Sequence, residues 1–150
     1  MENQNVRTAM EMPLVSWHLK IGWWGLLAFL SLGIVLEAMH GFKLGWYLDV
    51  SNHIRRLMLT LAHTHGALLS LVNLAFAATL FMRQAEETTS QRIASRSLAC
   101  ATILIPGGFF LGGLIIWGGD PGLGVVLVPL GACFLVVGVF LTARELAREK

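Results

Sequence analysis

Charge and cysteine are both scarce in this 150-residue chain. Only 13% of its residues are charged, whereas soluble domains carry about 25%. The 11 Lys and Arg residues stand at the edges of apolar runs and form no basic patch, which excludes a nucleic-acid partner. The two cysteines, Cys100 and Cys133, lie in apolar stretches without CxxC spacing. We therefore expect no disulfide and interpret both as packing residues.

Apolar residues, at 55% of the chain, are what the sequence has in abundance. They form four stretches, and a helix needs about 20 apolar residues to cross roughly 30 Å of hydrocarbon. The last two stretches lack the polar stripe that a helix of a soluble bundle would show. The sequence therefore predicts an all-α integral membrane four-helix bundle with an up-down-up-down path. The expected helices cover residues 21–40, 57–82, 97–117 and 122–143, with a short interfacial lead-in at 13–20 and no regular structure at 1–12.

Lys and Arg are distributed unequally between the two expected sides of the membrane. Eight fall on the side of the termini, namely Arg7, Lys20, Arg83, Arg92, Arg96, Arg144, Arg148 and Lys150. The other side has three, Lys43, Arg55 and Arg56. By the positive-inside rule both termini are cytoplasmic, in a multi-pass protein of the inner (plasma) membrane. The first apolar run is too long for a signal peptide, so we expect it to stay as an anchor. The expected partners are lipid and either other membrane subunits or further copies of this chain.

Small residues mark the second half of the chain. Gly108 and Gly112 form a GxxxG pattern, which lets two helix backbones approach closely. The segment Gly118–Pro121, GGDP, predicts a tight turn between antiparallel helices. A pore or substrate path along these glycines is the alternative interpretation.

Four ionisable residues fall inside the expected spans: Glu37, His40, His63 and His65. Such groups are costly in a bilayer and favour a functional interpretation. His63 and His65 point about 200° apart on a helix, so they cannot hold one ion together. The face of His63 carries small and polar residues, which predicts that it is interior. The face of His65 is bulky and suits lipid or another protein, so His65 is the second choice as a cofactor ligand.

Glu37 and His40 are spaced i, i+3 and share one helix face. With His63 they would form two histidines and a carboxylate, a set that suits one Fe, Cu or Zn ion with open positions. Too few carboxylates are present for a di-iron centre. The alternatives are a Glu–His hydrogen bond that satisfies two buried polar groups, a proton relay and a pigment role. His18, in the lead-in, and His53, in the loop, are expected to be solvated.

The run from Arg55 to Asn73 reads RRLMLTLAHTHGALLSLVN. With the following Ala75–Thr79 segment, it resembles the second helix of haem–copper oxidase and nitric oxide reductase catalytic subunits. In that family an arginine precedes a His-Thr or His-Gly pair whose histidine ligates low-spin haem b. The resemblance implies that His63 is the haem ligand. The Arg-to-His spacing is longer here, and the family's other ligands and twelve-helix body have no counterpart, so an oxidase is not implied.

The sequence supports three hypotheses about function. The leading one is a small accessory membrane subunit with one cofactor site, haem b or a metal ion, working near electron-transfer or respiratory chemistry. The second is a structural or assembly subunit in which Glu37 and His40 stabilise packing. The third is a membrane oxidoreductase that uses a 2-His-1-carboxylate metal site. Whether the chain is an enzyme is left open.

Overall fold

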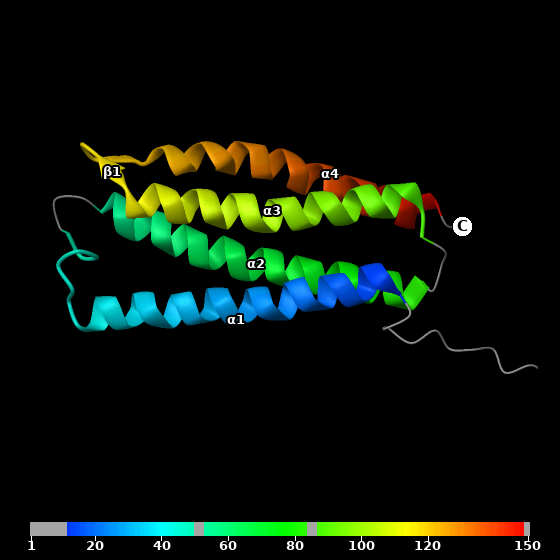
Figure 1. Cartoon of the computed structure of the whole chain (residues 1–150), viewed down its shortest axis with the longest axis horizontal. Coiled ribbons are helices and arrows are strands. Elements are labelled where there is room, and N and C mark those ends of the chain that lie inside the picture. Colours follow the sequence, from blue (N-terminus) through cyan, green and yellow to red (C-terminus); the bar gives the residue numbers. More distant parts are fainter. Residues whose placement is uncertain (1–11, 50–52, 84–86, 149–150) are drawn as a thin grey trace, which may run out of the picture.

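Four long helices make up nearly all of the structure. The computed structural model describes residues 12–49, 53–83 and 87–148. Its helices are α1 (Pro13–Gly41), α2 (Ile54–Arg83), α3 (Thr89–Leu114) and α4 (Leu127–Arg148). Consecutive helices run antiparallel (Figure 1). Each is long and apolar enough to cross a membrane, α4 together with the short helix before it. The prediction of an all-α, membrane-type four-helix fold is confirmed at this level.

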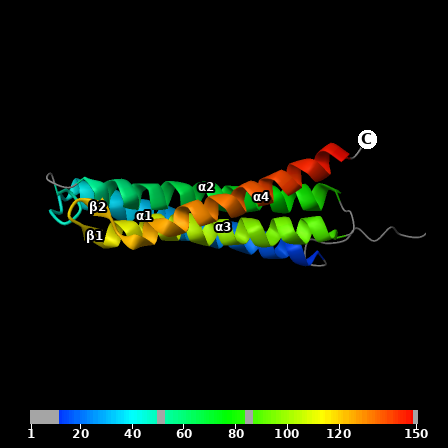
Figure 2. The ribbon, with the colours of Figure 1, turned by 90° about the horizontal axis from the view of Figure 1, so that it is seen from above.

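The helices follow one another in space as they do in sequence. α1 packs on α2, α2 on α3, and α3 on α4, so α1 and α4 form the two outer layers (Figure 1). α4 runs obliquely, from beside α3 at one end toward the end of α2 at the other (Figure 2). We call the end where α1 begins and α4 ends the terminal end, and the opposite one the hairpin end. The core therefore lies along α2 and α3.

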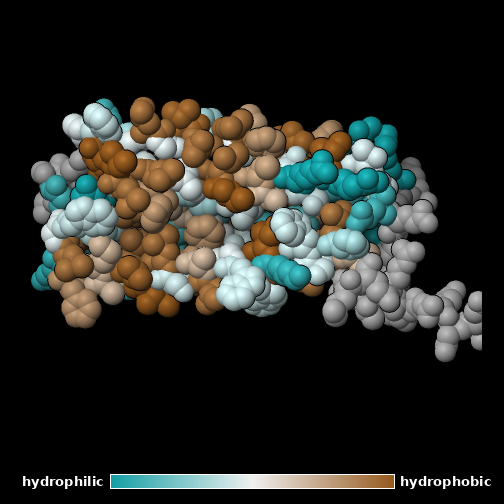
Figure 3. Space-filling model, in the orientation of Figure 1, coloured by the Kyte–Doolittle hydropathy of each residue, from teal (hydrophilic) through white to brown (hydrophobic). Residues whose placement is uncertain are grey.

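The outer helices leave much apolar surface uncovered. Trp24 and Ile34 of α1 and Val136 of α4 are each about 70% exposed, at 70%, 71% and 68%. Apolar side chains cover most of one face toward the hairpin end, and hydrophilic ones gather toward the terminal end (Figure 3). An apolar surface of this extent suits lipid or another membrane helix.

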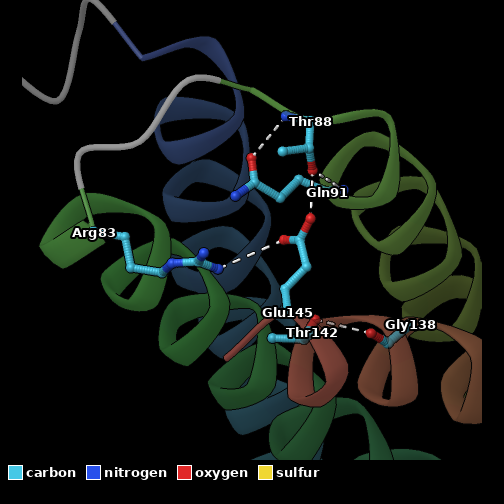
Figure 4. A network of polar contacts seen from close by, with 6 residues as sticks. All are labelled: Arg83, Thr88, Gln91, Gly138, Thr142 and Glu145. Atoms are coloured by element: carbon cyan, nitrogen blue, oxygen red, sulfur yellow. Dashed lines mark hydrogen bonds and ion pairs between the residues drawn. The ribbon is translucent and has the colours of Figure 1, made fainter. Parts of the chain in front are cut away.

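Polar contacts join three helices at the terminal end. Thr88 caps α3, because its side chain accepts a hydrogen bond from the backbone of Gln91 while the Gln91 side chain accepts one from the Thr88 backbone (Figure 4). The Thr88 hydroxyl also donates to Glu145 of α4. Glu145 in turn lies 3.5 Å from the Arg83 guanidinium of α2. Glu145 thus holds the C-terminal part of α4 to the end of α2 and the start of α3.

A tight hairpin connects α3 to α4. Two short strands, β1 (Ile116–Trp117) and β2 (Asp120–Pro121), pair antiparallel across Gly118 and Gly119. Both glycines have positive φ, 56° and 104°, which suits two-residue turns between strands. A 3₁₀ helix, η2 (Leu123–Val126), then leads into α4. The predicted turn at 118–121 is confirmed.

Three helices begin earlier than the sequence analysis expected, α2 by three residues and α1 and α3 by eight each. α1 starts at Pro13 and not at residue 21, and α3 starts at Thr89 and not at residue 97. Proline suits the first position of a helix, and the Thr88–Gln91 capping box supplies the start of α3. The interpretation of residues 13–20 as a separate lead-in is therefore wrong. The extensions of α1 and α3 lie at the terminal end, where they bring polar residues of α1 and α3 together.

Glycines allow close approach at both outer interfaces. On α1, a Cβ at Gly33 would come within 2.4 Å of the His63 ring, and one at Gly25 within 2.3 Å of the Ser70 hydroxyl. Reciprocally, a Cβ on Gly66 of α2 would come within 2.2 Å of Phe29. Between α3 and α4, a Cβ on Gly108 would come within 2.9 Å of Val128 and 3.0 Å of a backbone oxygen. The close-packing interpretation of Gly108 is confirmed, and α1 and α2 use the same device.

Neighbouring glycines provide a matched test of the α3–α4 contact. Gly108→Ala should lower the free energy of unfolding by about 1–3 kcal/mol, because the new methyl group would overpack against α4. Gly107→Ala is the control, since a Cβ there meets nothing within 4 Å. It should keep or raise the stability by roughly 0.5–1 kcal/mol, as alanine favours the helix. Thermal unfolding of both variants in detergent checks this, and equal melting temperatures would show that Gly108 faces no helix.

Candidate functional site

His63 lies at the contact between α1 and α2. Its ring packs on the backbone of Gly33, and its Nδ1 lies 2.7 Å from the carbonyl oxygen of Phe29. A carbonyl can only accept, so Nδ1 carries the proton and donates it. In the neutral tautomer that this bond selects, Nε2 is the nitrogen that carries the lone pair, and it lies on the far side of the ring from Nδ1. Within the described residues, Nε2 has no hydrogen-bond partner. The hydrogen bond to Phe29 thus orients the His63 ring, and Nε2 is the ring atom available to bind a ligand.

An open groove of about 920 Å³ runs beside His63, between α1 and α2. Apolar side chains of α1 form much of its wall, and a few polar groups join them. We call it the α1–α2 groove, and its lining residues are Leu30, Gly33, Ile34, Leu36, Glu37, Ala38, His40, Tyr47, Thr60 and His63. All three residues of the predicted metal set therefore line one groove.

The three do not form a ligand cluster. Glu37 and His40 are exposed, and no hydrogen bond or ion pair joins either of them to His63 in the part of the chain described. Among the described residues, no group of three or more His, Cys, Asp or Glu side chains comes together as a metal site would require. The expected direct contact between Glu37 and an imidazole is wrong. Both residues lie near the C-terminal end of α1.

His65 faces a different helix from His63. Its ring lies 5.0 Å from that of Phe109 on α3, and its Nδ1 lies 2.9 Å from the carbonyl oxygen of Leu61. The prediction that His63 and His65 point in different directions is confirmed. The bulky face of α2, expected to suit lipid or another protein, is buried inside this chain at Leu69 and Phe76, whereas its Leu68 is 57% exposed. α2 therefore packs on α1 through one face and on α3 through another.

A second polar site, absent from the sequence analysis, is buried at the terminal end. His18 of α1 is 0% exposed and contacts two helices. Its Nδ1 lies 2.6 Å from Oδ1 of Asn73 on α2, and its Nε2 lies 2.8 Å from the Ser95 hydroxyl on α3. The Asn73 amide nitrogen donates to Thr102 of α3 at 2.8 Å. The expectation that His18 is solvated is wrong, whereas His53 is exposed as expected.

The hydrogen bonds of this network fix its protons. Asn73 Nδ2 donates to the Leu69 carbonyl at 2.7 Å, so Oδ1 must be the atom that faces His18. His18 therefore carries a proton on Nδ1. The Ser95 hydroxyl can donate to Nε2 of the neutral ring, so both ring nitrogens have hydrogen-bond partners. A buried polar group is tolerated only with such partners. The network joins α1, α2 and α3 and leaves no ring nitrogen for a ligand, which indicates a structural role.

The comparisons with known proteins return nothing: no protein-family model, curated protein or solved structure matches the chain. The resemblance of α2 to haem-ligating helices therefore stays a prediction. The geometry alone distinguishes the two sites. His63, which lines the α1–α2 groove, has one ring nitrogen without a hydrogen-bond partner among the described residues, whereas both ring nitrogens of His18 are hydrogen-bonded.

Proposed function

We propose that this chain is a small membrane subunit that binds haem b through His63 in the α1–α2 groove. The observation that carries the proposal is the 2.7 Å hydrogen bond from His63 Nδ1 to Phe29, which orients the ring and leaves the Nε2 lone pair available. Histidines that ligate iron or zinc commonly donate their other ring N–H to a carbonyl or carboxylate in this way. The chain would then serve as an accessory to electron transfer.

The groove suits a flat apolar cofactor. Its volume of about 920 Å³ falls within the roughly 300–1,000 Å³ of cofactor and small-molecule sites. Leu30, Ile34 and Leu36 offer apolar contact, and the groove opens toward the surface of α1. His63 would be the residue that holds haem, and the bound haem would supply one-electron transfer. His63 would fix the iron position, and the walls would limit access of water.

A single-metal centre fits the described residues less well. It would need Glu37, His40 and His63 to converge on one point, and they do not converge among the described residues. The oxidoreductase hypothesis depends on that convergence, so we place it below haem binding. Glu37 and His40 would instead line the polar mouth of the groove, where both are exposed.

A structural or assembly subunit is the second candidate. Two observations favour it: the His18 network is complete without any ligand, and the outer faces of α1 and α4 are apolar and uncovered. A subunit of this kind would meet other membrane helices through those faces. The absorption spectrum and iron content of the purified protein separate the candidates. A Soret band with stoichiometric iron supports haem, and a stoichiometric metal without that band supports a metal site. The absence of both the band and the metal supports the structural subunit.

We further propose that the protein is a multi-pass protein of the plasma membrane with both termini in the cytoplasm, on the distribution of Lys and Arg. Gly45→Cys at the hairpin end should then label from outside the cell, and Glu87→Cys at the terminal end only from inside. Both are made in a background with Cys100 and Cys133 replaced by alanine. A Cβ at Gly45 meets nothing within 4 Å, so the substitution should not disturb the fold. Labelling of both from one side would refute the four-span arrangement, and reversed labelling would refute the orientation.

A further inference from the structure

A second hollow lies at the hairpin end, beside the α1–α2 groove. Its volume is about 750 Å³, and the two share His40. The end of α1, the loop after it and the start of α2 form its walls. We call it the hairpin-end pocket, and its lining residues are His40, Gly41, Lys43, Gly45, Leu48, Asp49, His53 and Arg56.

Positive charge predominates in this pocket. Lys43 and Arg56 are both exposed, and neither side chain makes an ion pair or hydrogen bond within the described part of the chain. Asp49 is the carboxylate among the lining residues, so two permanent positive charges face one negative charge. His40 and His53 add imidazole nitrogens. The pocket therefore offers several hydrogen-bond donors and a net attraction for an anion.

The adjacent arginine, Arg55, behaves differently and holds the pocket wall in place. Its guanidinium donates to the carbonyl oxygens of Trp46, at 2.8 Å, and Gly113, at 3.3 Å. It also lies 4.4 Å above the centre of a Trp46 ring. Tyr47, the residue after Trp46, is 4% exposed and belongs to the core. The loop is thus fastened to α3 through Arg55, whereas Arg56 is left to meet a ligand.

Lys43 occupies a backbone position that favours glycine. Its φ is 52°. At this end of α1 the N–H of Leu44 donates to the carbonyl oxygen of Met39, and the N–H of Lys43 donates to the carbonyl oxygen of His40. Glycine is the usual residue at this left-handed position, and another residue costs roughly 1–2 kcal/mol there. Backbone strain of this kind is concentrated at functional sites. A charged side chain in the strained position points to a ligand that uses the charge.

We infer that the hairpin-end pocket binds the phosphate group of an anionic phospholipid. Lys43 and Arg56 supply the charge, and a phosphate group accepts charge-assisted hydrogen bonds from lysine and arginine. The acyl chains would run over Phe42 and Leu44, which flank Lys43 and are 81% and 47% exposed. This lipid would lie outside the α1–α2 groove, so the inference does not depend on haem binding.

The test uses the full chain in a neutral detergent, with phosphatidylglycerol, phosphatidylcholine or inorganic phosphate added. We expect phosphatidylglycerol to raise the melting temperature and the other two additions to leave it unchanged. Arg56→Gln should weaken binding roughly fivefold, as expected for one charge near an anionic head group. Lys43→Gly should weaken binding similarly while raising the melting temperature without lipid, because the strain is relieved. Arg92→Gln, exposed on α3 at the terminal end, is the control and should bind as the wild type does.

Several results would overturn the inference. Equal stabilisation by phosphatidylcholine would show that any lipid suffices, and equal stabilisation by inorganic phosphate would show a free-anion site. An unchanged phosphatidylglycerol response in both Lys43→Gly and Arg56→Gln would place the lipid elsewhere. If Arg92→Gln weakened phosphatidylglycerol binding as much as Arg56→Gln does, the binding would reflect general charge attraction and not the hairpin-end pocket.

Discussion

Asn73→Leu should lower the free energy of unfolding by about 1–3 kcal/mol, although leucine is close to asparagine in size. The substitution leaves the Nδ1–H of His18 buried without an acceptor, and a buried unsatisfied donor costs about that much. Thr102 would lose the hydrogen bond that its hydroxyl accepts from Asn73, but it would keep the one that it donates to the Leu98 carbonyl at 2.8 Å. Denaturation in mixed micelles, followed by circular dichroism, measures the change.

A double-mutant cycle tests whether His18 and Asn73 act as a pair. His18→Phe removes the donor, and the double variant removes donor and acceptor together. The double variant should be more stable than the sum of the single effects predicts, with a coupling energy of about 0.6–1.7 kcal/mol, as for hydrogen bonds between membrane helices. His53→Ala, at an exposed position, should change little. Additive effects of His18→Phe and Asn73→Leu would contradict the network.

The number and type of helices could be predicted because the apolar runs are long and contain few charges. The helix starts could not be predicted from hydropathy, because the first turns of α3 are polar and those of α1 mix apolar and polar residues, so both lie outside the long apolar runs. The signal for α3 is nevertheless present in the sequence, as Thr88 and Gln91 have the spacing of a capping box. Hydropathy locates the apolar part of a helix, and capping residues locate the residue at which the helix begins.

The His18 site escapes prediction for the same reason. His18 lies in residues 13–20 and Ser95 in residues 89–96, two segments that hydropathy leaves outside the helices. Once α1 and α3 are extended, these residues lie opposite Asn73, a residue that helical rotation places at the edge of the His63 face. The two contacts of His18 join residues that are 55 and 77 positions apart in the sequence. A single sequence does not show which residues of two helices so far apart lie at the same level.

The α1–α2 groove could be predicted in part. Helical rotation correctly separates His63 from His65, because two residues span more than half a turn. The sequence also places Glu37, His40 and His63 at similar depth, and they line one groove. It does not contain the distances among them, which depend on how α1 rotates against α2. Gly33 and Gly66 determine that rotation by admitting His63 and Phe29 at close range.

His63→Ala should abolish haem binding, the largest effect that the proposal predicts. The substitution removes the Nε2 lone pair, which is the ligand atom that the α1–α2 groove offers. His65→Ala is the matched control, because it deletes an imidazole two residues away that packs on Phe109 of α3. It should keep the cofactor in full. Added imidazole should restore binding to His63→Ala by occupying the vacated space, a rescue that a merely misfolded variant would not show.

The visible absorption spectrum of the purified wild-type chain and these two variants, expressed with haem available, tests the central claim most directly. The account predicts a Soret band that shifts on reduction with dithionite in the wild type and in His65→Ala, and no such band in His63→Ala until imidazole is added. A wild-type protein without haem, or a His63→Ala variant that keeps the wild-type spectrum, would contradict it.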